Sequence, residues 1–185
     1  MRDGGRNTID KMKPFYEEQG FFVKEVDYGW MGLLGVRFCN MHLAHILARL
    51  LDPDCYLVGH SNGCAISALA CDFGYRPAGL VFLQPALNRN WVPPAQVPWL
   101  KIYRNTDDLP VWLATWLRNH IWGQMGRLGP SYKDDRVETV DIGFGGHNAE
   151  FKSPAIMQWI AEDLKQRYLK DEEKQRQLNR ERYRT

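Results

Sequence analysis

The sequence Gly59-His60-Ser61-Asn62-Gly63 is a G-x-S-x-G pattern, and its residue types and spacing are those of an activated serine. An apolar run of strand length, Cys55–Val58, precedes it, and a small-residue run of helix length, 62–73, follows it. A serine at so sharp a strand-to-helix turn is held in a strained conformation with its hydroxyl exposed. The positions two before and two after it lie too close to neighbouring backbone to carry side chains, and glycine fills both. We therefore predict Ser61 as a nucleophile, and the alternative interpretation is a serine in an ordinary strand-to-helix turn.

A serine hydroxyl needs a base to remove its proton, and the base needs an acid to orient it. Downstream of Ser61, Asp107 and Asp108 follow an apolar run expected to be a strand, and His147 lies in a glycine-rich loop. The other downstream histidine, His120, falls within a predicted helix. A surface loop histidine is the alternative interpretation of His147.

The fold must hold these residues close together. Apolar runs of strand length alternate with helical patterns along the chain. The alternation predicts an α/β fold, a three-layer α/β/α sandwich with a mostly parallel central sheet. The predicted strands are 21–28, 55–58, 78–83, 99–103 and 136–142. Predicted helices cover about 8–20, 38–50, 62–73, 111–124 and the segment from Ser153-Pro154 onward, with loops at 29–35, 88–98 and 143–147.

Together the motif and the order Ser, Asp, His resemble the α/β-hydrolase superfamily, in a small form with a minimal cap. The resemblance implies Ser61 as nucleophile within GHSNG and His147 as base within GFGGHN. It implies Asp107 as the acid within YRNTDD, because Asp107 fits the family's offset from the strand end better than Asp108, the alternative acid. No metal and no organic cofactor is expected.

The resemblance also implies an oxyanion hole, with the backbone N–H of Asn62 as one donor. The family's second donor comes from a loop after an early strand, and here Gly4 or Gly5 would supply it. The segment Met1–Gly5 leaves no room for that strand. We therefore expect an N-terminally shortened hydrolase or a rearranged sheet.

The expected function is that of a serine esterase or lipase-like hydrolase acting on a small-molecule acyl substrate. Ester, thioester and amide bonds all remain open. Tryptophans could form an apolar wall for the acyl group or simply pack in the core; they are Trp91, Trp99, Trp112, Trp116 and Trp122. The alternative function is that of a catalytically silent hydrolase-like fold used for binding.

Length, charge and composition limit the number of domains, the kinds of binding partner and the location of the protein. A chain of 185 residues predicts one domain, 1–164, with a charged helical extension at 165–185. The net charge of +2 gives no reason to expect nucleic-acid binding, although the basic extension leaves it weakly open. No apolar run approaches the roughly 18 residues that span a bilayer, and the polar start lacks the apolar core of a signal peptide, so the expected location is cytoplasmic. The four cysteines form no C-x-x-C pair and are expected to be free thiols.

Overall fold

The structure is a computed structural model that describes residues 8–26, 33–108, 122–143 and 145–182, with side chains of the first long helix described from Cys39 onward. Contacts divide the chain into two compact units. The first unit contains the described residues of Tyr28–Ala149, and the second contains those of Gly5–Asp27 and Glu150–Thr185. Each unit is described separately below.

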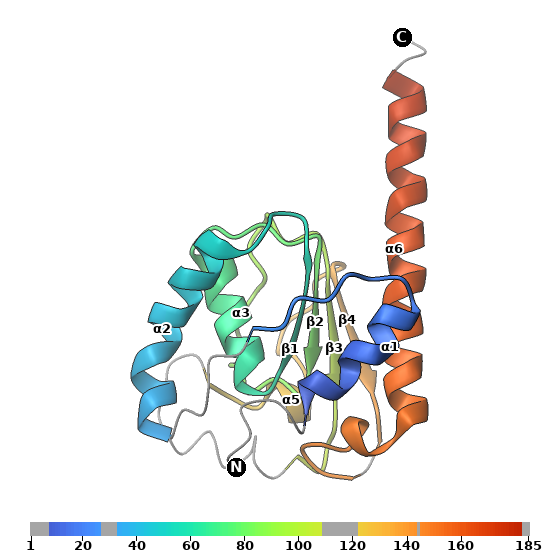
Figure 1. Cartoon of the computed structure of the whole chain (residues 1–185). Coiled ribbons are helices and arrows are strands. Elements are labelled where there is room, and N and C mark those ends of the chain that lie inside the picture. The colour runs from blue at the N-terminus through green and yellow to red at the C-terminus, as the bar shows by residue number, and fades with distance from the viewer. Residues whose placement is uncertain (1–7, 27–32, 109–121, 144, 183–185) are drawn as a thin grey trace. The chain divides into compact units, whose positions relative to one another are not determined.

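The first unit is built on four parallel strands, β1 (Tyr56–His60), β2 (Gly79–Leu83), β3 (Leu100–Arg104) and β4 (Val137–Asp141). Their order in the sheet is β1-β2-β3-β4, so each strand pairs with the next one along the chain (Figure 1). All five residues of β2 are buried, as expected for a central parallel strand. The predicted α/β class with a parallel sheet is therefore confirmed.

Helices α2 (Leu33–Leu50) and α3 (Asn62–Asp72) pack on one another, and α3 also packs on β1 (Figure 1). Helix α3 is buried on nearly all sides because its residues are small; the buried ones are Cys64, Ala65, Ile66, Ser67, Ala68, Ala70 and Cys71. The short helix α5 (Met125–Leu128) lies against β3. Helix α2 begins before the predicted position, so the predicted loop 29–35 is wrong for residues 33–35.

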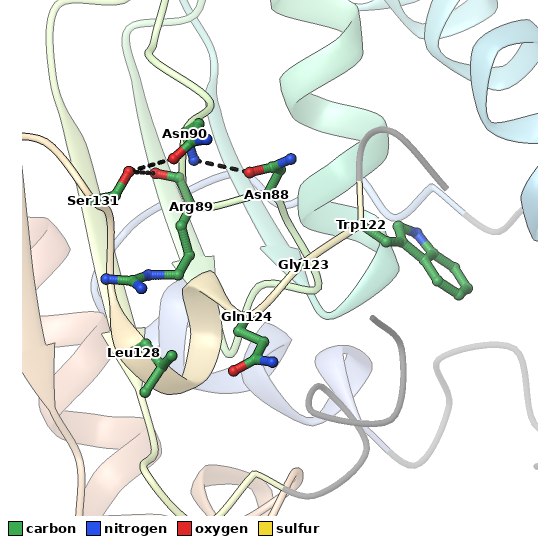
Figure 2. A pocket seen from close by; sticks show the side chains of 8 residues that line it. All are labelled: Asn88, Arg89, Asn90, Trp122, Gly123, Gln124, Leu128 and Ser131. Carbon is green, nitrogen blue, oxygen red and sulfur yellow. Dashed lines mark hydrogen bonds between the residues drawn. The ribbon is translucent and has the colours of Figure 1, made fainter. Parts of the chain in front are cut away.

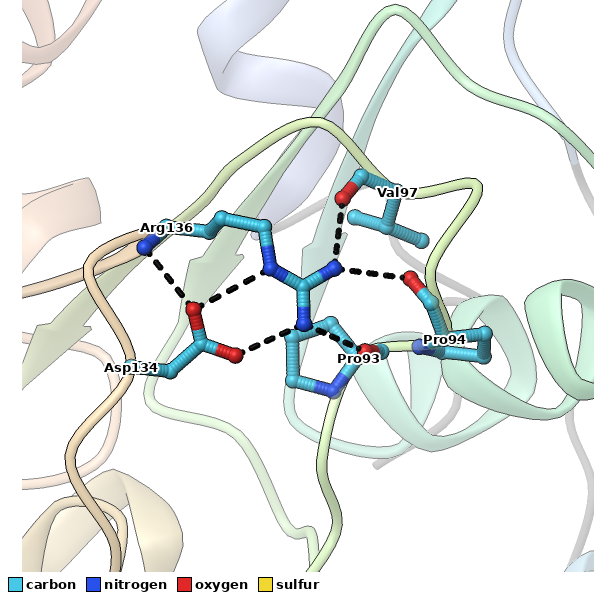
Figure 3. A network of polar contacts seen from close by, with 5 residues as sticks. All are labelled: Pro93, Pro94, Val97, Asp134 and Arg136. Carbon is cyan, nitrogen blue, oxygen red and sulfur yellow. Dashed lines mark hydrogen bonds and ion pairs between the residues drawn. The ribbon is translucent and has the colours of Figure 1, made fainter.

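The segment before β3 is irregular, as its prolines predict, and Arg136 holds it in place (Figure 3). The guanidinium pairs with Asp134 through two contacts, Nε to Oδ1 at 3.1 Å and Nη2 to Oδ2 at 2.7 Å. It also donates to the carbonyls of Pro93, Pro94 and Val97 at 2.9 to 3.0 Å. These hydrogen bonds to Arg136 keep the pKa of Asp134 below its ordinary value.

Replacing Arg136 with lysine is expected to lower the free energy of unfolding by about 1–3 kcal/mol, because an ammonium cannot reproduce this planar fork. The measurement is urea unfolding monitored by circular dichroism. Arg167→Lys is the matched control, because Arg167 forms an exposed ion pair with Asp171 and this replacement should change stability by less than about 0.5 kcal/mol. Equal losses in the two variants would contradict this assignment.

The second unit contains η1 (Ile9–Met12), α1 (Lys13–Glu18), η3 (Glu150–Lys152) and α6 (Pro154–Arg182). Helix α6 begins as predicted, with the Ser153 hydroxyl accepting from the N–H of Ile156 at 3.4 Å. Thr8 precedes η1 and makes no side-chain capping bond to it. The predicted strand 21–28 is wrong for residues 21–26, which form no regular structure, and its last two residues lie outside the described residues.

Two further observations concern the described residues only. No described helix combines the length and the apolar character needed to cross a membrane. All four cysteines are free; Cys64 and Cys71 are buried, and burial raises the pKa of the Cys71 thiol to about 12.

The predicted helix 111–124 lies mostly outside the described residues, and Trp122, Gly123 and Gln124 are not helical.

Candidate functional site

Ser61 stands between β1 and α3 in a backbone conformation that non-glycine residues seldom adopt, with φ of 52° and ψ of −116°. Such strain costs on the order of 1–3 kcal/mol and persists only where the surroundings impose it. Here the N–H of Ser61 donates to the carbonyl of Leu83 at 3.0 Å. The carbonyl of Ser61 accepts from Cys64 and Ala86, both at 3.2 Å. The strained strand-to-helix turn predicted for the GHSNG motif is therefore present.

Gly59 has the steric role that the motif predicts. A Cβ at this position would lie 2.9 Å from the nitrogen of Cys64 and 3.0 Å from the carbonyl carbon of Gly63. Both are backbone atoms, which cannot move aside without displacing the first turn of α3. Gly63 lies in that first turn, so both motif glycines are found where the end of β1 contacts the start of α3.

The structure brings Asp108, and not Asp107, to His147. Asp108 Oδ2 lies 2.7 Å from His147 Nδ1, and the two side chains are 0% and 11% exposed. Asp107 is exposed to solvent. The carboxylate that contacts His147 is therefore that of the alternative, Asp108, and the preference for Asp107 in that position is corrected.

A turn formed by Asn105 explains this reversal. The side-chain oxygen of Asn105 accepts from the N–H of Asp107 at 3.0 Å, and its backbone carbonyl accepts from the N–H of Asp108 at 3.2 Å. Asparagine at the start of a turn commonly bonds the backbone two residues on. This geometry leaves Asp107 outside and turns Asp108 inward.

The contact with Asp108 fixes the chemistry of His147. A carboxylate accepts hydrogen bonds, so Nδ1 carries a proton, and in the neutral imidazole Nε2 then keeps a lone pair. Among the described residues, no hydrogen bond joins Ser61 Oγ to His147. His147 nevertheless lies beside the serine turn, because its ring centroid is 4.8 Å from that of His60, the residue before Ser61.

His60 is partly buried and neutral. Its Nε2 lies 3.1 Å from the backbone carbonyl of His147. Desolvation, with a smaller contribution from the neighbouring His147, lowers the pKa of His60 to about 3. The sequence prediction assigned no role to this residue.

Asn62 begins α3, so its N–H belongs to the helix turn whose donors have no partner within the helix. Its side chain forms a reciprocal amide pair with Asn40 of α2, at 2.7 and 3.1 Å. The indole Nε1 of Trp122 donates to the same Asn62 oxygen at 2.9 Å. Gly4 and Gly5, the predicted second oxyanion donors, lie outside the described residues.

Sequence reasoning missed Asn40, which is 2% exposed. The signal available was a polar residue on an apolar helical stripe, since Asn40 precedes Leu43 and Leu47 by three and seven positions. Trp122 contacts a predicted site residue, Asn62. Trp91 instead donates to Asp72, Trp99 packs over Gly79, and Trp112 and Trp116 lie outside the described residues.

An open pocket of about 390 Å³ lies next to this network (Figure 2). It is lined by both polar and apolar surface, from Asn88, Arg89, Asn90, Trp122, Gly123, Gln124, Leu128 and Ser131. Neither Ser61 nor His147 lines it, and Trp122 connects it to Asn62. The pocket is thus adjacent to the serine turn without containing it.

Within the described part of the chain, no three His, Cys, Asp or Glu side chains come close enough together to bind a metal ion. Acyl transfer by a serine requires three groups of the kinds found here, namely a serine, a histidine and a carboxylate that contacts the histidine. No protein-family profile matches this sequence, and no curated protein is significantly similar to it.

Proposed function

We propose that this protein is a serine hydrolase of the α/β-hydrolase type that cleaves an ester-type bond through an acyl-enzyme intermediate. The observation that carries the proposal is the 2.7 Å contact between the buried Asp108 and His147, beside a serine with φ of 52°. A binding protein has no chemical need for a buried carboxylate that sets the tautomer of a histidine next to a strained serine. The three-layer hydrolase architecture is part of this proposal.

The reaction begins when His147 Nε2 removes the proton of Ser61 Oγ and Oγ attacks the substrate carbonyl. The Asn62 N–H, at the start of α3, stabilises the negative charge that develops on the carbonyl oxygen. Asp108 holds the Nδ1 proton and stabilises the imidazolium. His147 then gives its proton to the leaving alcohol, and the acyl group remains on Ser61.

The second half of the reaction uses water. His147 removes a proton from a water molecule, which attacks the acyl carbonyl, and the proton returns to Ser61 Oγ as the carboxylic acid leaves. Catalytic hydrogen bonds in free enzymes are often long and shorten when substrate binds. On this mechanism the Ser61–His147 bond forms with substrate in place, and no cofactor takes part.

The testing experiment is covalent labelling of the 185-residue protein with a fluorophosphonate, followed by mass spectrometry of the intact chain and its peptides. We expect one adduct, located on Ser61, because this reagent phosphonylates only activated serines. Ser61→Ala should abolish labelling, and His147→Ala should slow it by at least about 10³-fold. Ser67→Ala is the matched control, since Ser67 is a buried serine on the same helix, α3, and should leave labelling unchanged.

Circular dichroism establishes that each variant is folded. Folded native protein that acquires no adduct would overturn the proposal. It would favour the alternative of a catalytically silent fold used for binding. In that case Ser61 and His147 would lack a hydrogen bond both in the free protein and in the presence of the reagent.

A further inference from the structure

The loop that carries His147 has a backbone with unusual freedom. Gly143, Gly145 and Gly146 have φ values of 86°, 133° and 77°, a region that glycine enters readily and other residues avoid. Glycines also leave such a loop many conformations, and a general base must stay within a fraction of an ångström of its target. Something other than the loop's own sequence must therefore hold His147.

Two consecutive carbonyls of this loop accept hydrogen bonds from side chains outside it. The Gly146 carbonyl accepts from Asn105 Nδ2 at 3.1 Å, and the His147 carbonyl lies 3.1 Å from His60 Nε2. A carbonyl oxygen can only accept, so the hydrogen-bond network assigns the proton of neutral His60 to Nε2. The loop is thus held at two adjacent points, one from the end of β1 and one from the turn after β3.

The orientation of Asn105 is determined by its surroundings. Its side chain is completely buried, and its oxygen accepts from the N–H of Asp107 while its nitrogen donates to Gly146. The reverse amide orientation would face donor with donor and acceptor with acceptor. One side chain therefore shapes the turn that presents Asp108 and also anchors the loop that presents His147.

We infer that His60 and Asn105 are positioning residues that hold the His147 loop in register with Asp108 by hydrogen bonding the carbonyls of His147 and Gly146. This inference rests on the proposed hydrolase function for its effect on rate, but its geometric content stands apart from activity. Losing either donor leaves a loop carbonyl without its side-chain partner and releases one of the two anchors. The base then samples positions away from Asp108 and Ser61.

Four variants test the inference through the rate of fluorophosphonate labelling. His60→Leu removes the donor at similar volume, and Asn105→Asp keeps the oxygen that faces Asp107 but removes the donor to Gly146. Each is expected to slow labelling by about 10- to 100-fold, the effect of misplacing a catalytic group by about 1 Å. His60→Gln, whose amide can donate at the position of Nε2, should restore most of the rate. His45→Leu removes an exposed histidine of α2 that stacks on Phe73, and should leave the rate unchanged.

A second measurement separates this inference from the proposed function. The proton on His147 Nδ1, shared with Asp108, is followed by nuclear magnetic resonance of the ¹⁵N-labelled histidines. It should exchange with water faster in His60→Leu and Asn105→Asp than in the native protein and His60→Gln. If the native protein is never labelled but this exchange still accelerates, the hydrolase proposal fails and the positioning role stands. Folded His60→Leu and Asn105→Asp proteins with native labelling and native proton exchange would overturn the inference.

Discussion

Replacing Asp108 with asparagine is expected to slow fluorophosphonate labelling and hydrolysis of a short-chain chromogenic ester by about 10⁴-fold while leaving the fold intact. The carboxylate lies 2.7 Å from His147 Nδ1 and is completely buried. An asparagine there can donate its amide N–H to Nδ1, which places the imidazole proton on Nε2. A protonated Nε2 cannot accept the Ser61 proton, so the base is lost although every side chain keeps its place. The measurement is kcat at saturating substrate, with circular dichroism to verify folding.

Asp107→Asn is the matched control, because it makes the same chemical change at the neighbouring residue. Asp107 is exposed, and only its backbone N–H bonds to Asn105. We expect its rate to stay within about threefold of the native value, since water and salt screen the charge of an exposed carboxylate. A large loss in Asp107→Asn with a small loss in Asp108→Asn would restore Asp107 as the acid and contradict the geometry described above.

Replacing Gly59 with alanine is expected to impair both stability and rate. The added Cβ would lie 2.9 to 3.0 Å from backbone atoms of Gly63 and Cys64, so the first turn of α3 must shift. Overpacking of this kind costs about 1–3 kcal/mol of unfolding free energy. The same shift displaces Ser61 and the Asn62 N–H, and a displacement of about 1 Å should slow labelling by about 10²-fold. Urea unfolding and the labelling rate measure the two effects.

Gly74→Ala provides the contrast that separates stability from site geometry. Gly74 follows α3 with φ of 96°, and nothing lies within 4 Å of a Cβ placed there. An alanine at that φ costs about 1–2 kcal/mol through backbone strain alone. Gly74→Ala should therefore unfold earlier in urea but keep its labelling rate. If Gly59→Ala retains the native labelling rate, the steric account of the serine turn is wrong.

Secondary structure was predictable from the sequence wherever local pattern and burial agree. The strands β1, β2, β3 and β4 coincide with the predicted apolar or alternating runs to within two residues at each end. Helix α3 coincides with the run of small residues after the serine, and α6 begins at the predicted Ser153-Pro154 signal. In β2 and α3 the residues that form the pattern are buried, and in α6 they mark the start of the helix.

The predicted strand at residues 21–28 shows where local pattern fails. Its aromatic and branched residues favour an extended ladder, but Phe22 is 87% exposed and no described strand pairs with the segment. Phe21 packs instead edge-on against Tyr16 and Tyr168, with the ammonium of Lys165 5.6 Å from its ring centroid. The Phe21 ring therefore packs against aromatic side chains of helices and not within a sheet. The sequence pattern around Phe21 does not distinguish packing against a helix from pairing in a strand.

The candidate site was predictable to the extent that its residues lie in motifs. Ser61, His147 and Gly59 could be assigned because a strand, a turn or a glycine-rich loop surrounds each of them. Choosing Asp108 over Asp107 required the turn that Asn105 makes with the next residues, which leaves Asp107 exposed and Asp108 buried. Asn40 and Trp122 were beyond prediction as partners of Asn62, since they come from segments 22 and 60 residues away.

The strand order of the sheet places His147 after an edge strand, which affects how stably the site is held. Strands join in the order in which they are synthesised, and the three residues assigned to catalysis follow β1, β3 and β4. The last of these, β4, is at the edge of the sheet, and none of its five residues is fully buried. Segments with few buried contacts open locally at a lower free energy than the global unfolding of the core. We therefore expect the His147 loop to open locally at a lower free energy than the buried β2 and α3, so the proposed catalytic arrangement would be lost before the core unfolds.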